Sequence, residues 1–164
     1  MRVIIFTLIF SLASFALADN GKFKDHLMVW SIDIADTPDI DLQQIECQKR
    51  AVELSAVLKT IANNLRAPTD KLSLYTQLYL YEPGNITMGS YNVCSLTLLS
   101  DTAQFGYRLV KGGVHKGKTS LAQCKTDLDT LKAKPNILVA QLDDSWTLFQ
   151  GKNCQAYGVE VGQK

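Results

Sequence analysis

The spacing of hydrophobic residues along the chain changes from every second residue to every third or fourth residue, and then changes back. Over residues 27–35 the alternation places Met28 and Ile32 on one side and Val29 on the other, which predicts a first strand. From about 41 to 66 the steps of four and three predict a helix, which Asp39 or Asp41 can cap and Pro68 prevents from continuing. The apolar stripe of this helix consists of Cys47, Ala51, Leu54, Leu58, Ile61 and Leu65.

Period two returns over residues 71–81, where leucines alternate with polar and tyrosine residues. One side of this predicted strand is aliphatic and the other is rich in tyrosine. A break at 82–85 is followed by renewed alternation from Tyr91, which predicts a hairpin. If the aliphatic sides of both strands face one core, Cys94 points toward the helix that carries Cys47.

The second half of the chain repeats this order in shorter form. Residues 105–110 predict a strand, and residues 111–118 predict a glycine-rich basic loop. A capping box from Ser120 to Gln123 opens a helix that ends before Pro135. Its apolar stripe consists of Leu121, Cys124, Leu128 and Leu131. Strands are then predicted at 137–142, at 146–150 as its hairpin partner, and at 154–161.

These elements predict an α+β fold in which two helices pack on one face of an antiparallel sheet. Each half has the order strand, helix, strand, strand, which suggests two βαββ halves at 19–100 and 101–164 within one domain, 19–164. A ferredoxin-like split βαβ fold with extra strands is the alternative, because its element order is similar.

The first 18 residues have the pattern of a signal peptide. Arg2 is followed by an apolar run to Ala16, and Ala16-Leu17-Ala18 is a small-x-small cleavage site before Asp19. We therefore expect cleavage after Ala18 and a periplasmic or secreted location. No later apolar run approaches the length that a membrane span requires, so we expect no membrane insertion of the mature chain.

Four cysteines, an even number without a C-x-x-C pair, predict two structural disulfides in an oxidising compartment. Because each half has one cysteine on its helix and one near its last strands, we expect Cys47 to pair with Cys94 and Cys124 with Cys154. Without Arg2 the chain has 16 basic and 16 acidic residues, from 17 and 16 in the full sequence. This neutral balance argues against nucleic acid as a partner.

The tyrosine-rich side of the predicted hairpin is the first candidate binding surface, because tyrosine combines a large contact area with a polar group. It comprises Tyr75, Tyr79, Tyr81 and Tyr91. A second layer formed by Trp146, Phe149 or the C-terminal segment would instead make it part of the core. The basic loop, with His115, Lys116 and Lys118, is the second candidate, suited to an anion or an acidic surface.

No catalytic motif surrounds His26 or His115, the two histidines of the chain, and no metal or cofactor motif is present. The sequence therefore favours a non-enzymatic binding protein, in one form an inhibitor, that recognises a protein or a small ligand. The alternative is a small extracytoplasmic hydrolase with a carboxylate or histidine site. Asn85-Ile86-Thr87 is a glycosylation acceptor whose use depends on the source organism.

Overall fold

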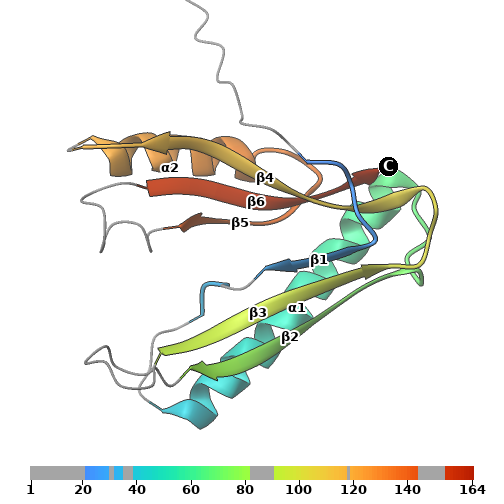
Figure 1. Ribbon diagram of the computed structural model, residues 1–164. Coiled ribbons are helices and arrows are strands. Elements are labelled where there is room, and N and C mark those ends of the chain that lie inside the picture. Colours follow the sequence, from blue (N-terminus) through green and yellow to red (C-terminus); the bar gives the residue numbers. More distant parts are fainter. Residues whose placement is uncertain (1–20, 30–31, 35–38, 82–90, 118, 144–153) are drawn as a thin grey trace, which may run out of the picture.

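The computed structural model describes residues 21–29, 32–34, 39–81, 91–117, 119–143 and 154–164, with the backbone alone at 80–81 and 91–92. The described part contains two helices and two antiparallel three-stranded sheets (Figure 1). Its elements follow the order βαββ twice, as one of the two sequence interpretations expected. The expected antiparallel sheet is thus divided into two, and the single ferredoxin-like sheet is not what forms.

Sheet 1 belongs to the first half of the chain and has the strand order β1-β3-β2. Its elements are β1 (His26–Val29), α1 (Ile40–Leu65), β2 (Leu72–Tyr81) and β3 (Tyr91–Ser100). All ten residues of β2 pair in unbroken register with β3, from Leu72 opposite Ser100 to Tyr81 opposite Tyr91. The predicted hairpin is therefore confirmed, and β1 adds to the free side of β3.

Sheet 2 belongs to the second half and has the equivalent order β4-β6-β5. Its elements are β4 (Phe105–His115), α2 (Ser120–Lys132), β5 (Ile137–Asp143) and β6 (Cys154–Gln163). In both halves the third strand lies in the centre and pairs with the strand on each side of it. The shared topology confirms the repeated pattern seen in the sequence.

Each helix is joined by a disulfide to the central strand of its own half. Cys47 of α1 pairs with Cys94 of β3, with Cα atoms 5.6 Å apart, and Cys124 of α2 pairs with Cys154 of β6, with Cα atoms 6.2 Å apart. Both distances lie in the usual range for disulfides. The predicted connectivity is confirmed, and two disulfides fit an oxidising, extracytoplasmic location.

The main core lies where α1 packs against both sheets. Leu96 and Leu98 of β3 and Val159 and Val161 of β6 are buried in the same cluster as Leu58 and its neighbours on α1. A smaller cluster of Val110, Leu131 and Ala156 lies beneath α2 on the other side of sheet 2. The layers therefore run sheet 1, α1, sheet 2, α2.

Two predicted boundaries differ from the structure. The first strand ends at Val29 instead of continuing to residue 35, and Val29 and Ile32 both lie in the core, whereas the prediction placed them on opposite sides. β4 continues through Gly112 and Gly113 to His115, so residues 111–115 of the predicted basic loop are strand. A register shift between Lys111 and Val114 accommodates this segment.

The second helix also differs in detail. Its N-cap is Thr119, which makes no side-chain cap hydrogen bond, so the predicted capping box at Ser120 is wrong. Leu121 is 52% exposed, although the stripe placed it in the core. By contrast, Asp39 caps α1 as one of two expected residues, and its carboxylate accepts the amide hydrogens of Asp41 and Leu42.

The N-terminal segment of the described chain lies over sheet 2. Lys24 forms a β-bridge with Tyr107 of β4, and a Cβ atom added to Gly162 would lie 2.5 Å from the Phe23 ring. The guanidinium of Arg108 lies 4.5 Å from the centre of the same ring. Glu160 accepts hydrogen bonds from Arg108 and Asn136, which completes this cluster.

Several expectations fall outside the described residues: the leader at 1–18, the acceptor Asn85 and the strand at 146–150. In the part that the structure describes, no helix has the length and hydropathy to cross a membrane.

Candidate functional site

The tyrosine side of β2 faces away from α1, as the alternation predicted. Thr76, on the opposite side of the strand, donates a 2.6 Å hydrogen bond to the carbonyl oxygen of Cys47 in α1. Tyr75 is 48% exposed and Tyr79 is half-buried. The side of sheet 1 that faces away from α1 is called the outer face below.

Hydrogen bonds within sheet 1 hold the middle of the outer face in place. The Tyr79 hydroxyl donates to Oε1 of Gln77 at 3.2 Å, and the Ser95 hydroxyl donates to the backbone oxygen of Gln77 at 3.2 Å. Gln77 and Ser95 are directly opposite each other in β2 and β3. The exposed Tyr75 therefore lies beside residues that hydrogen bonds hold in place, namely Gln77, Tyr79 and Ser95.

The outer face is mixed in character. Thr97 of β3 is buried and lies in register between Met28 of β1 and Tyr75 of β2. Leu99, two residues further along β3, is 41% exposed. The described side chains here include no Asp, Glu, Lys or Arg, so the face offers aromatic, aliphatic and hydroxyl groups, with the imidazole of His26 at its edge.

The equivalent face of sheet 2, on the side away from α2, is buried. Val159 and Val161, on the side of β6 away from α2, are buried in the core cluster that includes α1. Among the described elements, by contrast, both helices pack elsewhere than on the outer face of sheet 1. The fold thus buries this face in one half and leaves Tyr75 and Leu99 accessible in the other.

The other two predicted tyrosines cannot be assigned in the same way. Tyr81 and Tyr91 are opposite each other in the hairpin register, but their side chains lie outside the described residues. Trp146 and Phe149, which were considered as a covering layer, also lie outside them. The C-terminal segment does not cover the outer face, because it forms β6 in the centre of sheet 2.

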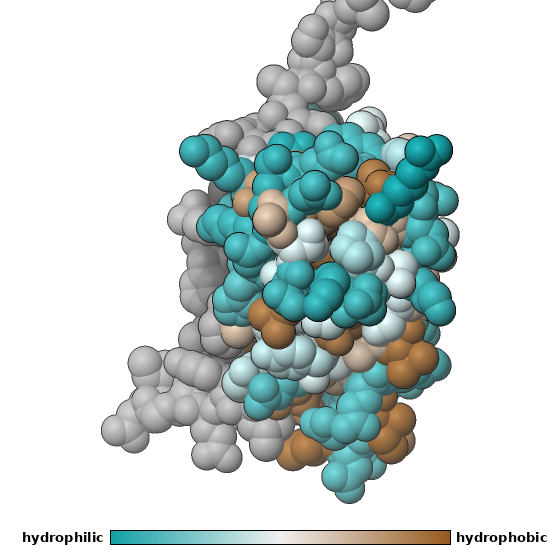
Figure 2. All heavy atoms as spheres, turned by 90° about the vertical axis from the view of Figure 1, so that its right-hand side faces the viewer, coloured by the Kyte–Doolittle hydropathy of each residue, from teal (hydrophilic) through white to brown (hydrophobic). Residues whose placement is uncertain are grey.

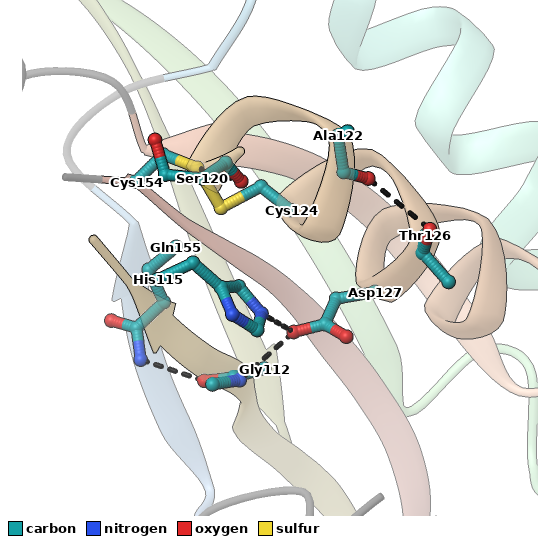
Figure 3. Close-up of a disulfide and its surroundings, with 10 residues drawn as sticks. Gly112, His115, Ser120, Ala122, Cys124, Thr126, Asp127, Cys154 and Gln155 are labelled. Carbon is teal, nitrogen blue, oxygen red and sulfur yellow. Dashed lines mark hydrogen bonds and ion pairs between the residues drawn. A yellow bond between two sulfur atoms is a disulfide. The ribbon is translucent and has the colours of Figure 1, made fainter. Parts of the chain in front are cut away.

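The second predicted site, around His115, lies in the other half of the molecule. Figure 3 shows the His115 ring pointing toward Asp127 of α2, with Nε2 at 2.8 Å from Oδ2. The same carboxylate oxygen accepts the Gly113 amide hydrogen at 3.0 Å. Lys116 is exposed, and Lys118 lies outside the described residues.

Asp127 is a residue that the sequence analysis missed. It is only 7% exposed, and its position between Cys124 and Leu131 places it on the buried stripe of α2. An acidic residue on an apolar stripe was the available signal, since a buried carboxylate requires partners. The contacts tie the end of β4 to α2, so His115 is part of a structural contact instead of a free loop.

The structure does not bring the two predicted sites together. The outer face belongs to the first layer of the molecule, whereas His115 and Asp127 meet where sheet 2 contacts α2, at the opposite end of the layers. Tyr75 and Tyr79 therefore do not share one surface with His115.

A cavity of about 210 Å³ lies beside the N-terminal segment and is lined by Lys22, Lys24, Arg108 and Lys111. Arg108 is already paired with Glu160, at 2.7 Å between Nη2 and Oε2. Lys22, Lys24 and Lys111 give the lining of this cavity a positive charge. The sequence pattern predicted a basic site only at residues 111–118.

The side of the molecule at which β3 turns into β4 is mostly hydrophilic in its upper part, and separate hydrophobic patches lie in its lower part (Figure 2). In Figure 1 the N-terminal end of α1 lies in the lower part of the molecule, whereas its C-terminal end rises toward β4. The exposed hydrophobic residues of α1 include Leu42, Ile45 and Val52. No three side chains among the described His, Cys, Asp and Glu residues are grouped so that they could hold a metal ion.

Comparison with known protein families, with curated proteins and with solved structures finds no match to this chain.

Proposed function

We propose that this chain is an exported, non-enzymatic binding protein that recognises its partner through the outer face of sheet 1. The observation that carries this proposal is the exposure of Tyr75 and Leu99 on a sheet face whose counterpart in the other half is buried by α1. Exposed aromatic and aliphatic groups on a rigid sheet are typical of recognition surfaces.

The geometry favours a protein over a small ligand as the partner. A small-molecule site is normally a concave pocket that surrounds most of its ligand. The three cavities described, of about 360, 210 and 340 Å³, are lined by residues other than Tyr75, Tyr79 and Leu99. An extended sheet face suits the surface of another protein, as an inhibitor-like binding mode requires.

Export is part of the proposal and is supported by two features. The two disulfides require an oxidising environment, and the first 18 residues have the pattern of a cleavable signal peptide. Together they favour a periplasmic or secreted protein.

The alternative is a small extracytoplasmic hydrolase, and the His115–Asp127 pair is the observation in its favour. A carboxylate that orients a histidine is one part of a hydrolytic triad. Here, however, Asp127 also fixes the Gly113 amide, and the neighbouring Cys124 and Cys154 are joined in a disulfide. These contacts favour a structural role for the pair.

The test is the double substitution of Tyr75 and Tyr79 by Ser. If the outer face binds the partner, the double variant should lose affinity by about 1 to 2 kcal/mol or more per anchor, with a stability change within about 1 kcal/mol. Leu121→Ser, at a position of similar exposure on α2, is the matched control and should keep full affinity. The partner is first isolated from the native extracytoplasmic fraction with the wild-type protein.

Two results would show that the outer face is not the binding surface. One is a stable double variant that binds the partner normally. The other is a loss of several kcal/mol of folding stability, which would show that the rings belong to a buried layer.

A further inference from the structure

The two sheets have four edges, and three of them carry features that discourage further strand pairing. β1 is only four residues long. β5 has a register shift between Ile137 and Val139 and ends on Asp143. β4 carries Arg108 and Lys111, has a register shift, and is bridged by Lys24. Short length, bulges, charges and covering segments are the usual means of protecting an edge.

The fourth edge, β2, has none of these features. It is ten residues long, from Leu72 to Tyr81, and its register with β3 is unbroken. Its sequence, LSLYTQLYLY, contains no charged residue, no proline and no glycine. Among the described residues no strand pairs with its other side. A long, regular, uncharged edge presents free backbone groups to a further strand.

We propose that β2 pairs in antiparallel orientation with β2 of a second copy of this chain, so that two copies share one six-stranded sheet. Antiparallel pairing of identical strands is two-fold symmetric, the most common symmetry of protein dimers. A two-fold axis normal to the sheet keeps both α1 helices on one side. The leucine side of one copy then continues that of the other, and the two outer faces form one surface.

The side chains of β2 are compatible with this symmetry. Residues directly opposite each other in neighbouring strands point to the same side of the sheet. A two-fold axis near the middle of β2 must therefore lie between the two copies of Thr76 or between the two copies of Gln77. In the first register Leu74 lies opposite Leu78 of the second copy, and in the second Tyr75 lies opposite Tyr79 of the second copy. Both registers pair uncharged side chains, and neither brings like charges together.

A cavity beside this edge supports the same arrangement. It has a volume of about 360 Å³ and lies between α1 and β2. Its lining combines the apolar Leu58, Ala62, Leu72 and Leu74 with polar residues that include Lys59 and Asp70. Leu74 is only half-buried in the single chain. Leucines from the adjoining strand of a second copy would cover the apolar part of this lining and remove it from water.

The test is charge placed at Gln77, which is exposed and points to the outer face. In both registers the two Gln77 positions are directly opposite or diagonal neighbours, within reach of long side chains. Gln77→Lys and Gln77→Glu should each weaken the dimer by about tenfold or more, through repulsion between like charges. An equimolar mixture of the two variants should restore association as a mixed dimer.

Sedimentation velocity of the disulfide-bonded secreted protein, over a range of concentrations, measures these equilibria. Val52→Lys, at a 72% exposed position on α1, is the matched control and should dimerise like wild type. Circular dichroism of each variant establishes that the fold is retained, and the mixture reports on pairing even if one variant is less stable.

A wild-type protein that is monomeric at every concentration would overturn the proposal. So would Gln77 variants that dimerise as wild type does, or a mixture that associates no better than its components. The inference is independent of the proposed function, because strand pairing at the edge does not require a partner on the outer face.

Discussion

The hydroxyl of Tyr107 in β4 donates a hydrogen bond to the backbone oxygen of Leu99 in β3, over 3.2 Å. Its oxygen also lies 3.4 Å from the backbone oxygen of Ser73 in β2. Tyr107 is fully buried, so a side chain of the second half satisfies backbone groups of the first. This contact adds to the backbone bridge between Lys24 and Tyr107, which also joins the two halves.

Replacing Tyr107 by Phe should therefore lower the free energy of unfolding by about 1 kcal/mol, the usual net value of one hydrogen bond. Denaturant unfolding measures this change. Tyr75→Phe, at an exposed position, is the control and should be neutral. An unchanged stability of the Tyr107 variant would show that the hydroxyl does not contribute to the junction.

The same residue predicts how stability depends on alkaline pH. Burial raises the pKa of Tyr107 above its ordinary value. The folded state therefore holds the Tyr107 hydroxyl proton more tightly than the unfolded state does. The contribution of this proton to the free energy of unfolding is complete below pH about 10 and is lost as the pH rises further. Unfolding midpoints measured between pH 8 and 11 should fall at the alkaline end, and the fall should be smaller in Tyr107→Phe.

The close packing of Gly112 against Asp127 should leave no room for a larger residue at this position in β4. A Cβ atom at this position would lie 2.6 Å from Oδ2 of Asp127, so the carboxylate would have to move away from Gly113 and His115. Gly112→Ala should cost about 1 to 3 kcal/mol of stability, as overpacking usually does. Gly21→Ala, where nothing lies within 4 Å, should be neutral in the same thermal or denaturant measurement.

Gly162 and Phe23 should be energetically coupled. A Cβ atom on Gly162 would displace the Phe23 ring, so Gly162→Ala should destabilise the wild-type protein more than the Phe23→Ala variant. A double-mutant cycle should give a coupling of about 0.5 to 3 kcal/mol. Additive effects would show that the N-terminal segment does not pack on sheet 2 in solution.

Non-reduced peptide mapping should recover one peptide pair joined by Cys47 and Cys94 and another joined by Cys124 and Cys154. Their sequence separations of 47 and 30 correspond to about 4 and 3.6 kcal/mol in the chain-entropy model. Removing either bridge should therefore destabilise the protein by a comparable amount. A peptide that joins Cys47 to Cys124 would contradict the two-half fold.

Sequence alone identified most helices and strands because the period of hydrophobic residues reports which side of each element is buried. The alternation in β2 separated Leu74 and Leu78 from Tyr75 and Tyr79, and the helix stripe placed Cys47 on the side that faces Cys94. Since each helix packs on strands of its own half, these local patterns also sufficed for the disulfide pairing.

Only the tertiary structure determines how the two halves pack and which surfaces they bury in each other. No local pattern says that α1 packs on sheet 2, which buries Val159 and Val161 while Tyr75 on the equivalent face of sheet 1 remains accessible. The His115–Asp127 contact and the Tyr107 hydroxyl bond likewise join different elements. Periodicity reports that a side is buried, but the partner that buries it is fixed only when distant elements compete for the same apolar surface.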